Sequence, residues 1–398
     1  MPAEPFMDLV RDKVVSEVVV RLSQAKGPVK VEGTWGSFAR MLTTHISKSL
    51  RRPVLHLCAH IDDADRAFDD LKTFGVERVE LLPAWEGEED LADATDETRA
   101  ERLRIVSLLA DSNGGFQGLV IAAPVQALCQ PIPKPSALRE SALRVNRNDV
   151  VDPEQVIEWL VQNNFERVDA VDLPGQFARR GGIIDIYAPL ASRQDGGTGP
   201  ESQAVRIEFF GDTVESIRQI NLDTQRSTQE IAGIHVVAAA SGAVIEQREL
   251  FPNILPEDAI VVLEEPSDVE EVAKVFLTRI ERPERLYPWS QIHNSAARFT
   301  QLHICRFATG ENTRDGSDCA DWGPLAVGIK SVQQFERKAT SLWAGHKAAL
   351  EELLQRTKEG SDIRLYCESP AEIARITEIV REIAGEVPRG FQLLLGYV

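Results

Sequence analysis

Short apolar segments alternate with segments of helical periodicity along the first 135 residues of the chain. We predict strands at 54–58, 79–82 and 119–123, with helices at 8–24 and 61–74 and a further helix ending at 109. Strands that alternate with helices pair in parallel, because each crossover returns the chain to the same end of the sheet. The first fold expectation is therefore an α/β domain with a Rossmann-like parallel sheet covered on both faces.

A proline-rich stretch at 129–138 interrupts this pattern, and we predict that it is a stiff, extended connector. After it, a helix expected at 152–163 is followed by short strands with tight turns. Gly211-Asp212 stands between two apolar strand segments, which predicts a two-residue hairpin. We expect residues 136–222 to form an inserted α+β module with an antiparallel sheet.

The remaining sequence returns to the α/β pattern. We expect residues 223–335 to complete the domain begun by residues 1–135. Helices predicted at 342–358 and 370–384 flank a short strand, so residues 336–398 are expected to form a small C-terminal α/β domain. The whole chain is therefore predicted to be a multidomain α/β protein.

Composition narrows the possible functions. The net charge is -18, from 62 acidic and 44 basic residues, and such a surface repels the phosphate backbone of DNA. The five cysteines are scattered and never form a C-x-x-C pair, so we expect no disulfide framework and no metal site. No apolar run reaches the roughly 18 residues that span a bilayer, and the first residues do not resemble a signal peptide. We expect a cytoplasmic protein without a membrane partner.

One segment, at 31–42, has the outline of a phosphate-binding loop. The early glycine and serine positions of such a loop are held by Gly33, Gly36 and Ser37. A working loop would continue with Gly, Lys and Ser/Thr, where this chain has Phe38, Ala39 and Arg40. Since Ala39 removes the lysine, we interpret this segment as a degenerate nucleotide loop and expect no cofactor.

Other candidate catalytic groups are sparse. Glu264 and Glu265 follow a predicted strand at 259–263, and a solvated strand end is the expected interpretation rather than a metal site. His56 and His60 are expected to be structural. No Ser-His-Asp or Cys-His-Asn arrangement stands out, so we predict no catalytic residue.

Residues 175–227 carry the most specific signal. They contain GQFARRGGIIDIYAPL and, after a Gly- and Ser-rich loop, VRIEFFGDTVESIRQINLDTQRS. This stretch resembles the signature shared by the bacterial transcription-repair coupling factors and the excision-nuclease protein UvrB. Weaker similarity extends over LLPAWEGEED and LFPNILPEDAIVVLEEP. The degenerate loop and the acidic segment at 86–98, which has no tyrosine where UvrB has a tyrosine-rich hairpin, make the coupling factors the closer relatives.

The resemblance implies a function. It predicts a non-catalytic adaptor of transcription-coupled nucleotide excision repair that binds the damage-scanning subunit UvrA. The family's partner-contacting residues fall on Arg180, Arg206 and Phe210. Strand alternation also places Arg206 and Phe210 on one face, opposite an apolar face. The alternative for Arg206 is a simple ion pair with a neighbouring acid such as Glu208 or Glu215.

Two rival functions remain open at this point. One is a truncated member of the ATP-dependent DNA translocases and helicases, and the other is a DNA-binding protein similar to UvrB. The full-length coupling factors continue into a polymerase-binding domain and a translocase motor, neither of which this sequence contains. RNA polymerase and DNA are therefore expected as partners only of a longer chain, and the sequence is either a fragment or a short homologue.

Overall fold

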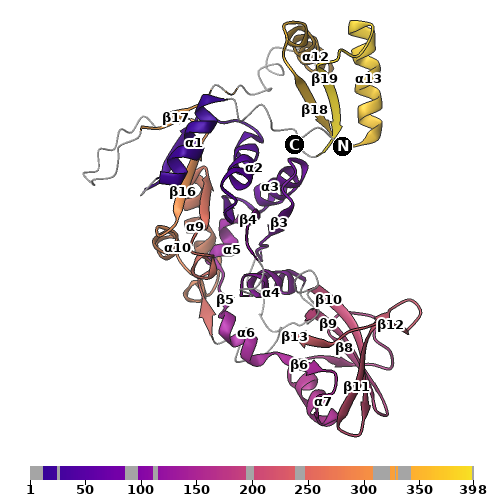
Figure 1. The fold of residues 1–398 in the computed structure, drawn as a ribbon. Helices are drawn as coiled ribbons and strands as arrows, with labels where there is room; N and C mark the ends of the chain where they lie inside the picture. Colours follow the sequence, from indigo (N-terminus) through magenta and orange to yellow (C-terminus); the bar gives the residue numbers. More distant parts are fainter. Residues whose placement is uncertain are drawn as a thin grey trace.

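The computed structural model describes residues 12–24, 27–85, 97–110, 115–193, 201–237, 247–307, 323–327, 329 and 342–396. Figure 1 shows a parallel α/β unit in the middle of the molecule, an antiparallel β unit at one end and a small α/β unit at the other. The acidic segment at 86–96 and the helix start at 8–11 lie outside the described residues. The predicted multidomain α/β fold is confirmed.

Two distant parts of the sequence share one parallel sheet. Its seven strands are ordered β17-β1-β16-β15-β2-β4-β3. They are β1 (Val29–Glu32), β2 (Val54–Cys58), β3 (Arg78–Leu81), β4 (Leu119–Pro124), β15 (Ile260–Glu264), β16 (Thr300–Cys305) and β17 (Leu325–Ala326). Because β1 pairs with β16 and β2 with β15, the late strands lie inside the sheet rather than beside it.

Helices cover both faces of this sheet, which explains why β2, β4 and most of β15 are apolar at every position or nearly so. One face packs on α1 (Lys13–Gln24), α2 (Phe38–Leu50) and α3 (Ile61–Thr73). The other packs on α4 (Glu97–Ala110), α5 (Val125–Cys129), α9 (Pro266–Arg279) and α10 (Trp289–Ala296), with the 3-10 turn Phe251–Ile254. Among the described residues, no helix combines the length and apolar character needed to cross a membrane.

The proline-rich connector is only partly extended, so that prediction is wrong for its second half. β5 (Ile132–Pro133) pairs with β14 (Arg248–Glu249), but α6 (Pro135–Ser141) is helical. Pro135 stands in the first turn of α6, where its missing N–H has no helical partner to lose and its fixed φ favours the helix.

The antiparallel sheet follows α6. Its main path is β12-β11-β10-β9-β13-β6, and β8 pairs with both β9 and β7. The strands are β6 (Leu143–Asn146), β7 (Glu166–Arg167), β8 (Gln176–Arg180), β9 (Ile183–Arg193), β10 (Glu201–Phe210), β11 (Thr213–Asn221), β12 (Arg226–Glu230) and β13 (Gly233–Val236). The predicted hairpin is confirmed, since Phe210 pairs with Thr213 across Gly211 and Asp212. Helix α7 (Pro153–Gln162) packs on one face through Val156 and Leu160.

The small C-terminal unit consists of two strands and two helices. β18 (Ile363–Cys367) pairs in parallel with β19 (Phe391–Leu395), and α12 (Leu342–Lys358) and α13 (Pro370–Ala384) have the predicted bounds. This unit contacts the end of α3, where the Tyr366 ring meets Phe74 edge-on at a centroid distance of 6.1 Å.

Candidate functional site

The three predicted partner-binding residues lie on one face of the antiparallel sheet. Val205 and Ile207 point into the core beneath α7, so the alternate residues of β10, Arg206 and Phe210, point to the opposite face. On this opposite face, strands β8, β9, β10 and β11 present Arg180, Asp185, Arg206, Glu208, Phe210 and Thr213. We call it the outer face.

Arg206 is held by an acid on the neighbouring strand. Its Nε donates to Asp185 Oδ1 at 2.7 Å and its Nη2 donates to Oδ2 at 2.8 Å, which is a bidentate pair between residues directly opposed in β10 and β9. The hydrogen bonds with Asp185 raise the pKa of Arg206. Asp185 is thus the partner, where the sequence suggested Glu208 or Glu215. Sequence reasoning gave Asp185 no role, although it lies within the signature.

Arg180 and Phe210 are more available than Arg206. The Phe210 side chain is 81% exposed at the tip of the β10–β11 hairpin. Arg180 is exposed at the end of β8 and donates from Nη2 to the backbone carbonyl of Asp169 at 2.7 Å. Within the described part of the chain it forms no ion pair, so its charge is not neutralised by a carboxylate.

Two glycines form the turn that lies beside Phe209. Gly181 has a φ of +63°, which favours glycine, and a Cβ added at Gly182 would lie 2.9 Å from the carbonyl oxygen of Phe209. The Phe209 N–H also donates to the Gly182 carbonyl at 2.8 Å, so the two backbones are in close contact. Gly181 and Gly182 therefore have a structural reason to be glycine.

We expect Gly182→Val to lower the free energy of unfolding by about 1 to 3 kcal/mol, because the new side chain must push the β10 backbone away. Thermal and urea unfolding measure this change. Gly115→Val is the matched control, because a Cβ at Gly115 meets no atom within 4 Å. Unchanged stability accompanied by loss of partner binding would contradict the structural assignment.

The degenerate nucleotide loop lies between β1 and α2, where a phosphate loop would stand. A Cβ at Gly33 (φ +79°) would lie 2.5 Å from the Val327 carbonyl oxygen, and the Val327 N–H donates to the Glu32 carbonyl at 2.9 Å. Ser37 precedes α2, and Ala39 is buried in its first turn. The loop is therefore covered at Gly33 by the backbone of the chain itself.

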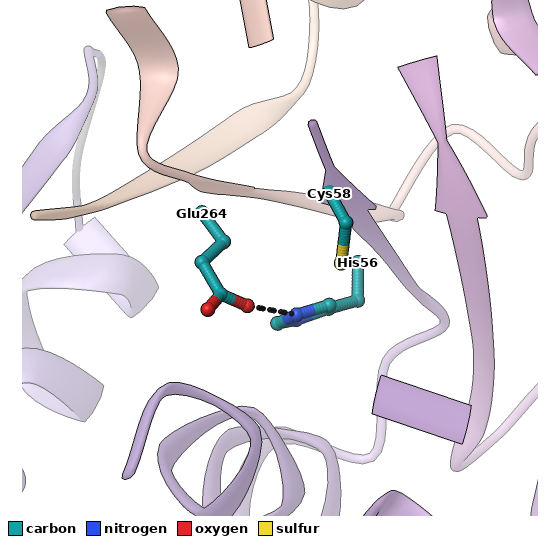
Figure 2. Close-up of side chains that lie close together, drawn as sticks. All are labelled: His56, Cys58 and Glu264. Carbon is teal, nitrogen blue, oxygen red and sulfur yellow. Dashed lines mark hydrogen bonds and ion pairs between the residues drawn. The ribbon is translucent and has the colours of Figure 1, made fainter. Parts of the chain in front are cut away.

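Charged and polar side chains are buried beneath the loop. Glu264 Oε2 lies 3.0 Å from His56 Nε2 and 3.1 Å from Arg40 Nε, although the Arg40 contact lacks hydrogen-bond geometry (Figure 2 shows the pair with His56). The Thr43 hydroxyl lies 3.0 Å from His56 Nδ1. Since the Glu264 side chain is only 17% exposed, the expectation of a solvated strand end is wrong for this residue. Side chains of β15 alternate between the two faces of the sheet, and Glu264 follows Ile260 and Val262 in pointing to the face covered by α1, α2 and α3.

Glu264 carries its charge in this cluster. Burial alone would raise the pKa of Glu264, but the hydrogen bond from His56 and the charge of Arg40 hold it below its ordinary value. Burial raises the pKa of the Cys58 thiol well above its usual range.

Three of these residues have donor atoms suited to a metal ion. The donor atoms of His56, Cys58 and Glu264 lie within 4.8 Å of one another (Figure 2), and thiolate, imidazole and carboxylate are ligands of zinc. Arg40, however, already places a cation against Glu264, with its Nε 3.1 Å from Oε2. The charge of the Glu264 carboxylate is therefore already balanced by an arginine of the chain itself.

Asp70 of α3 adds a pH-dependent group to the cluster. This residue is 5% exposed and its carboxylate accepts a hydrogen bond from Ser37, and burial raises its pKa from 3.8 to about 6. The folded state thus binds more protons than the unfolded state between these two pH values. Its contribution to stability is largest at low pH and is lost as the pH rises through about 6.

We therefore expect Asp70→Asn to stabilise the protein at pH 8 by about 2 kcal/mol, since two pKa units correspond to roughly 3 kcal/mol and part of this is offset by altered hydrogen bonding. At pH 5 the stabilisation by Asp70→Asn should be about 1 kcal/mol smaller than at pH 8. Urea unfolding at both pH values measures the difference. Glu77→Gln, at an exposed position between α3 and β3, is the control for the loss of a surface carboxylate.

Comparison with known proteins identifies the antiparallel unit. Residues 143–241 match the UvrB interaction domain family. The chain carries a UvrB interaction domain. This domain contains Arg180, Arg206 and Phe210, together with the α7-covered core on the other face of its sheet.

The similarity to whole proteins covers about half of the chain. The chain is 32% identical over 206 residues to the transcription-repair-coupling factor of Bacillus subtilis (strain 168), which is 51% of this chain and 16% of that protein. It is 33% identical over 207 residues to the factor of Mycobacterium bovis, covering 50% of this chain and 16% of that protein. It is 28% identical over 221 residues to the factor of Myxococcus xanthus, covering 53% of this chain and 17% of that protein. The chain thus spans about a sixth of these relatives, and the resemblance stated from the sequence is confirmed.

Proposed function

We propose that this chain is a non-catalytic adaptor of transcription-coupled nucleotide excision repair, and that it recruits UvrA through the outer face of its UvrB interaction domain. One observation carries the proposal. The segment that matches the domain family folds into a sheet whose helix-free face gathers the three residues expected to contact the partner.

The physical character of this face supports a protein partner. An exposed phenylalanine on the same face as arginines is typical of an interface anchor, since aromatic and arginine side chains carry much of the binding free energy in interfaces. Arg180 can form a bidentate pair with a carboxylate of the partner. The acidic chain as a whole, at -18, favours a protein surface over a phosphate backbone.

The cluster beneath the loop supports the non-catalytic part of the proposal. Arg40 pairs with Glu264, the carboxylate at the end of β15, and the Val327 backbone packs against Gly33 of the loop. We expect a fluorescent ATP analogue with magnesium to show no saturable binding below millimolar concentration, a scale that corresponds to about 4 kcal/mol. ATP hydrolysis above background, with or without DNA, would favour the rival translocase function.

Titration of the chain with purified UvrA tests the recruitment itself. We expect saturable binding that persists after nuclease treatment, because the contact is between proteins. Retention on DNA at low salt with no affinity for UvrA would instead favour the DNA-binding alternative.

A further inference from the structure

A second exposed apolar side chain stands in line with Phe210. Phe210 pairs with Thr213 across the hairpin, and Thr213 forms an isolated antiparallel bridge with Val150. Directly opposed residues of antiparallel strands point to the same face, so Val150, Thr213 and Phe210 form one row across the tip of the outer face. Val150 is 78% exposed. The apolar surface at the hairpin tip thus extends beyond Phe210 onto a different segment of the chain.

This row is fixed by the backbone. The Val151 N–H donates to the Asp212 carbonyl at 2.7 Å, and the Val214 N–H donates to the Asp149 carbonyl at 2.9 Å. Val214, next to Thr213, is fully buried in the core on the other face. A partner that binds the row would therefore not have to order this segment first, which removes a common cost of association.

An arginine without a carboxylate partner borders the row. The turn at Gly181 and Gly182 lies beside Phe209, as the hydrogen bond from the Phe209 N–H to the Gly182 carbonyl shows. Arg180 immediately precedes this turn; within the described residues its side chain donates to a backbone carbonyl and forms no ion pair. The tip therefore combines apolar surface with an available positive charge, and a matching surface would offer an apolar pocket beside a carboxylate.

We propose that Val150 belongs to the partner-binding surface, and that the partner presents one apolar pocket for Phe210 and Val150 next to an acid for Arg180. This inference rests on the proposed function, because the partner is the same UvrA. It adds a residue from outside the signature at 175–227, contributed by the segment before α7.

Charge introduced at Val150 tests the inference. We expect Val150→Glu to weaken the Kd for UvrA at least tenfold, and Val150→Ala to weaken it about threefold. The matched control is Val161→Glu, because Val161 is also an exposed valine, at 56%, but lies on α7, which covers the opposite face. The control should change the Kd less than twofold. Thermal unfolding of each variant checks the fold.

The outcomes separate the inference from the proposed function. Native affinity of Val150→Glu, alongside weakened binding by Phe210→Ala, would overturn the inference and leave the adaptor function standing. Absence of binding by the unmodified chain would overturn both. If Val150→Glu is unstable, Val150→Ala decides, because it adds no charge, and native affinity in that variant would overturn the inference.

Discussion

Replacing Phe210 with alanine and Arg180 with glutamate together is expected to weaken the binding of this chain to UvrA by at least a hundredfold. Each change should cost on the order of 2 kcal/mol if both residues are interface anchors, and tenfold in Kd corresponds to about 1.4 kcal/mol. Isothermal titration or interferometry with the full chain measures the loss. The fold should be retained, since Phe210 is 81% exposed and Arg180 is exposed at a strand end.

A matched pair of changes on another surface controls for general effects of charge and exposure. Arg279 is an exposed arginine at the end of α9, and Val275, on the same helix, is 39% exposed. Arg279→Glu and Val275→Ala should both leave the Kd unchanged. A folded Phe210→Ala, Arg180→Glu variant with native affinity would show that UvrA binds elsewhere.

The secondary structure was largely readable from the sequence because its signals are local. The Gly211-Asp212 turn predicts its hairpin through backbone preferences alone, and the apolar run of β2 predicts a strand buried on both faces. The helices at 342–358 and 370–384 were predicted to the residue. The prediction of an extended connector was wrong from Pro135 onward. A proline stiffens an extended chain but also favours the first turn of a helix, and the sequence does not distinguish these two uses.

The polar contacts of the sites could not be predicted, because each joins distant segments. His56 and Glu264 are 208 residues apart in the sequence and meet only because β2 and β15 are neighbours in the sheet. Likewise, Asp185 becomes the partner of Arg206 through the register of β9 and β10. A one-residue shift of that register would have turned Asp185 toward the core. The faces of strands follow from alternation, whereas ion pairs follow from register and topology.

Arg206→Ala is expected to lower the free energy of unfolding by about 3 kcal/mol, because it leaves the carboxylate of Asp185 without a counter-charge. Asp185 has a side chain only 3% exposed, and Arg206 supplies both of its charged hydrogen bonds. Charge reversal at Arg206 should cost more still, since two carboxylates would then face each other. Urea unfolding measures these losses, and an Arg206→Ala variant as stable as the native chain would contradict the importance of the pair.

Because Arg206→Ala destabilises the fold, weaker binding by that variant would not show that Arg206 contacts UvrA. The decisive variant removes Arg206 and Asp185 together. Asp185→Ala with Arg206→Ala leaves no unpaired charge, and we expect it to recover about 2 kcal/mol relative to Arg206→Ala. The Nη1 group of Arg206 makes a long hydrogen bond of 3.4 Å to the Ser227 hydroxyl, and the Arg206 side chain is 16% exposed, so a partner can reach only part of the guanidinium. We therefore expect the folded double variant to bind UvrA at least tenfold more weakly than the native chain. Native affinity would instead show that Arg206 serves the sheet, and that the contact surface is limited to the exposed residues at the tip.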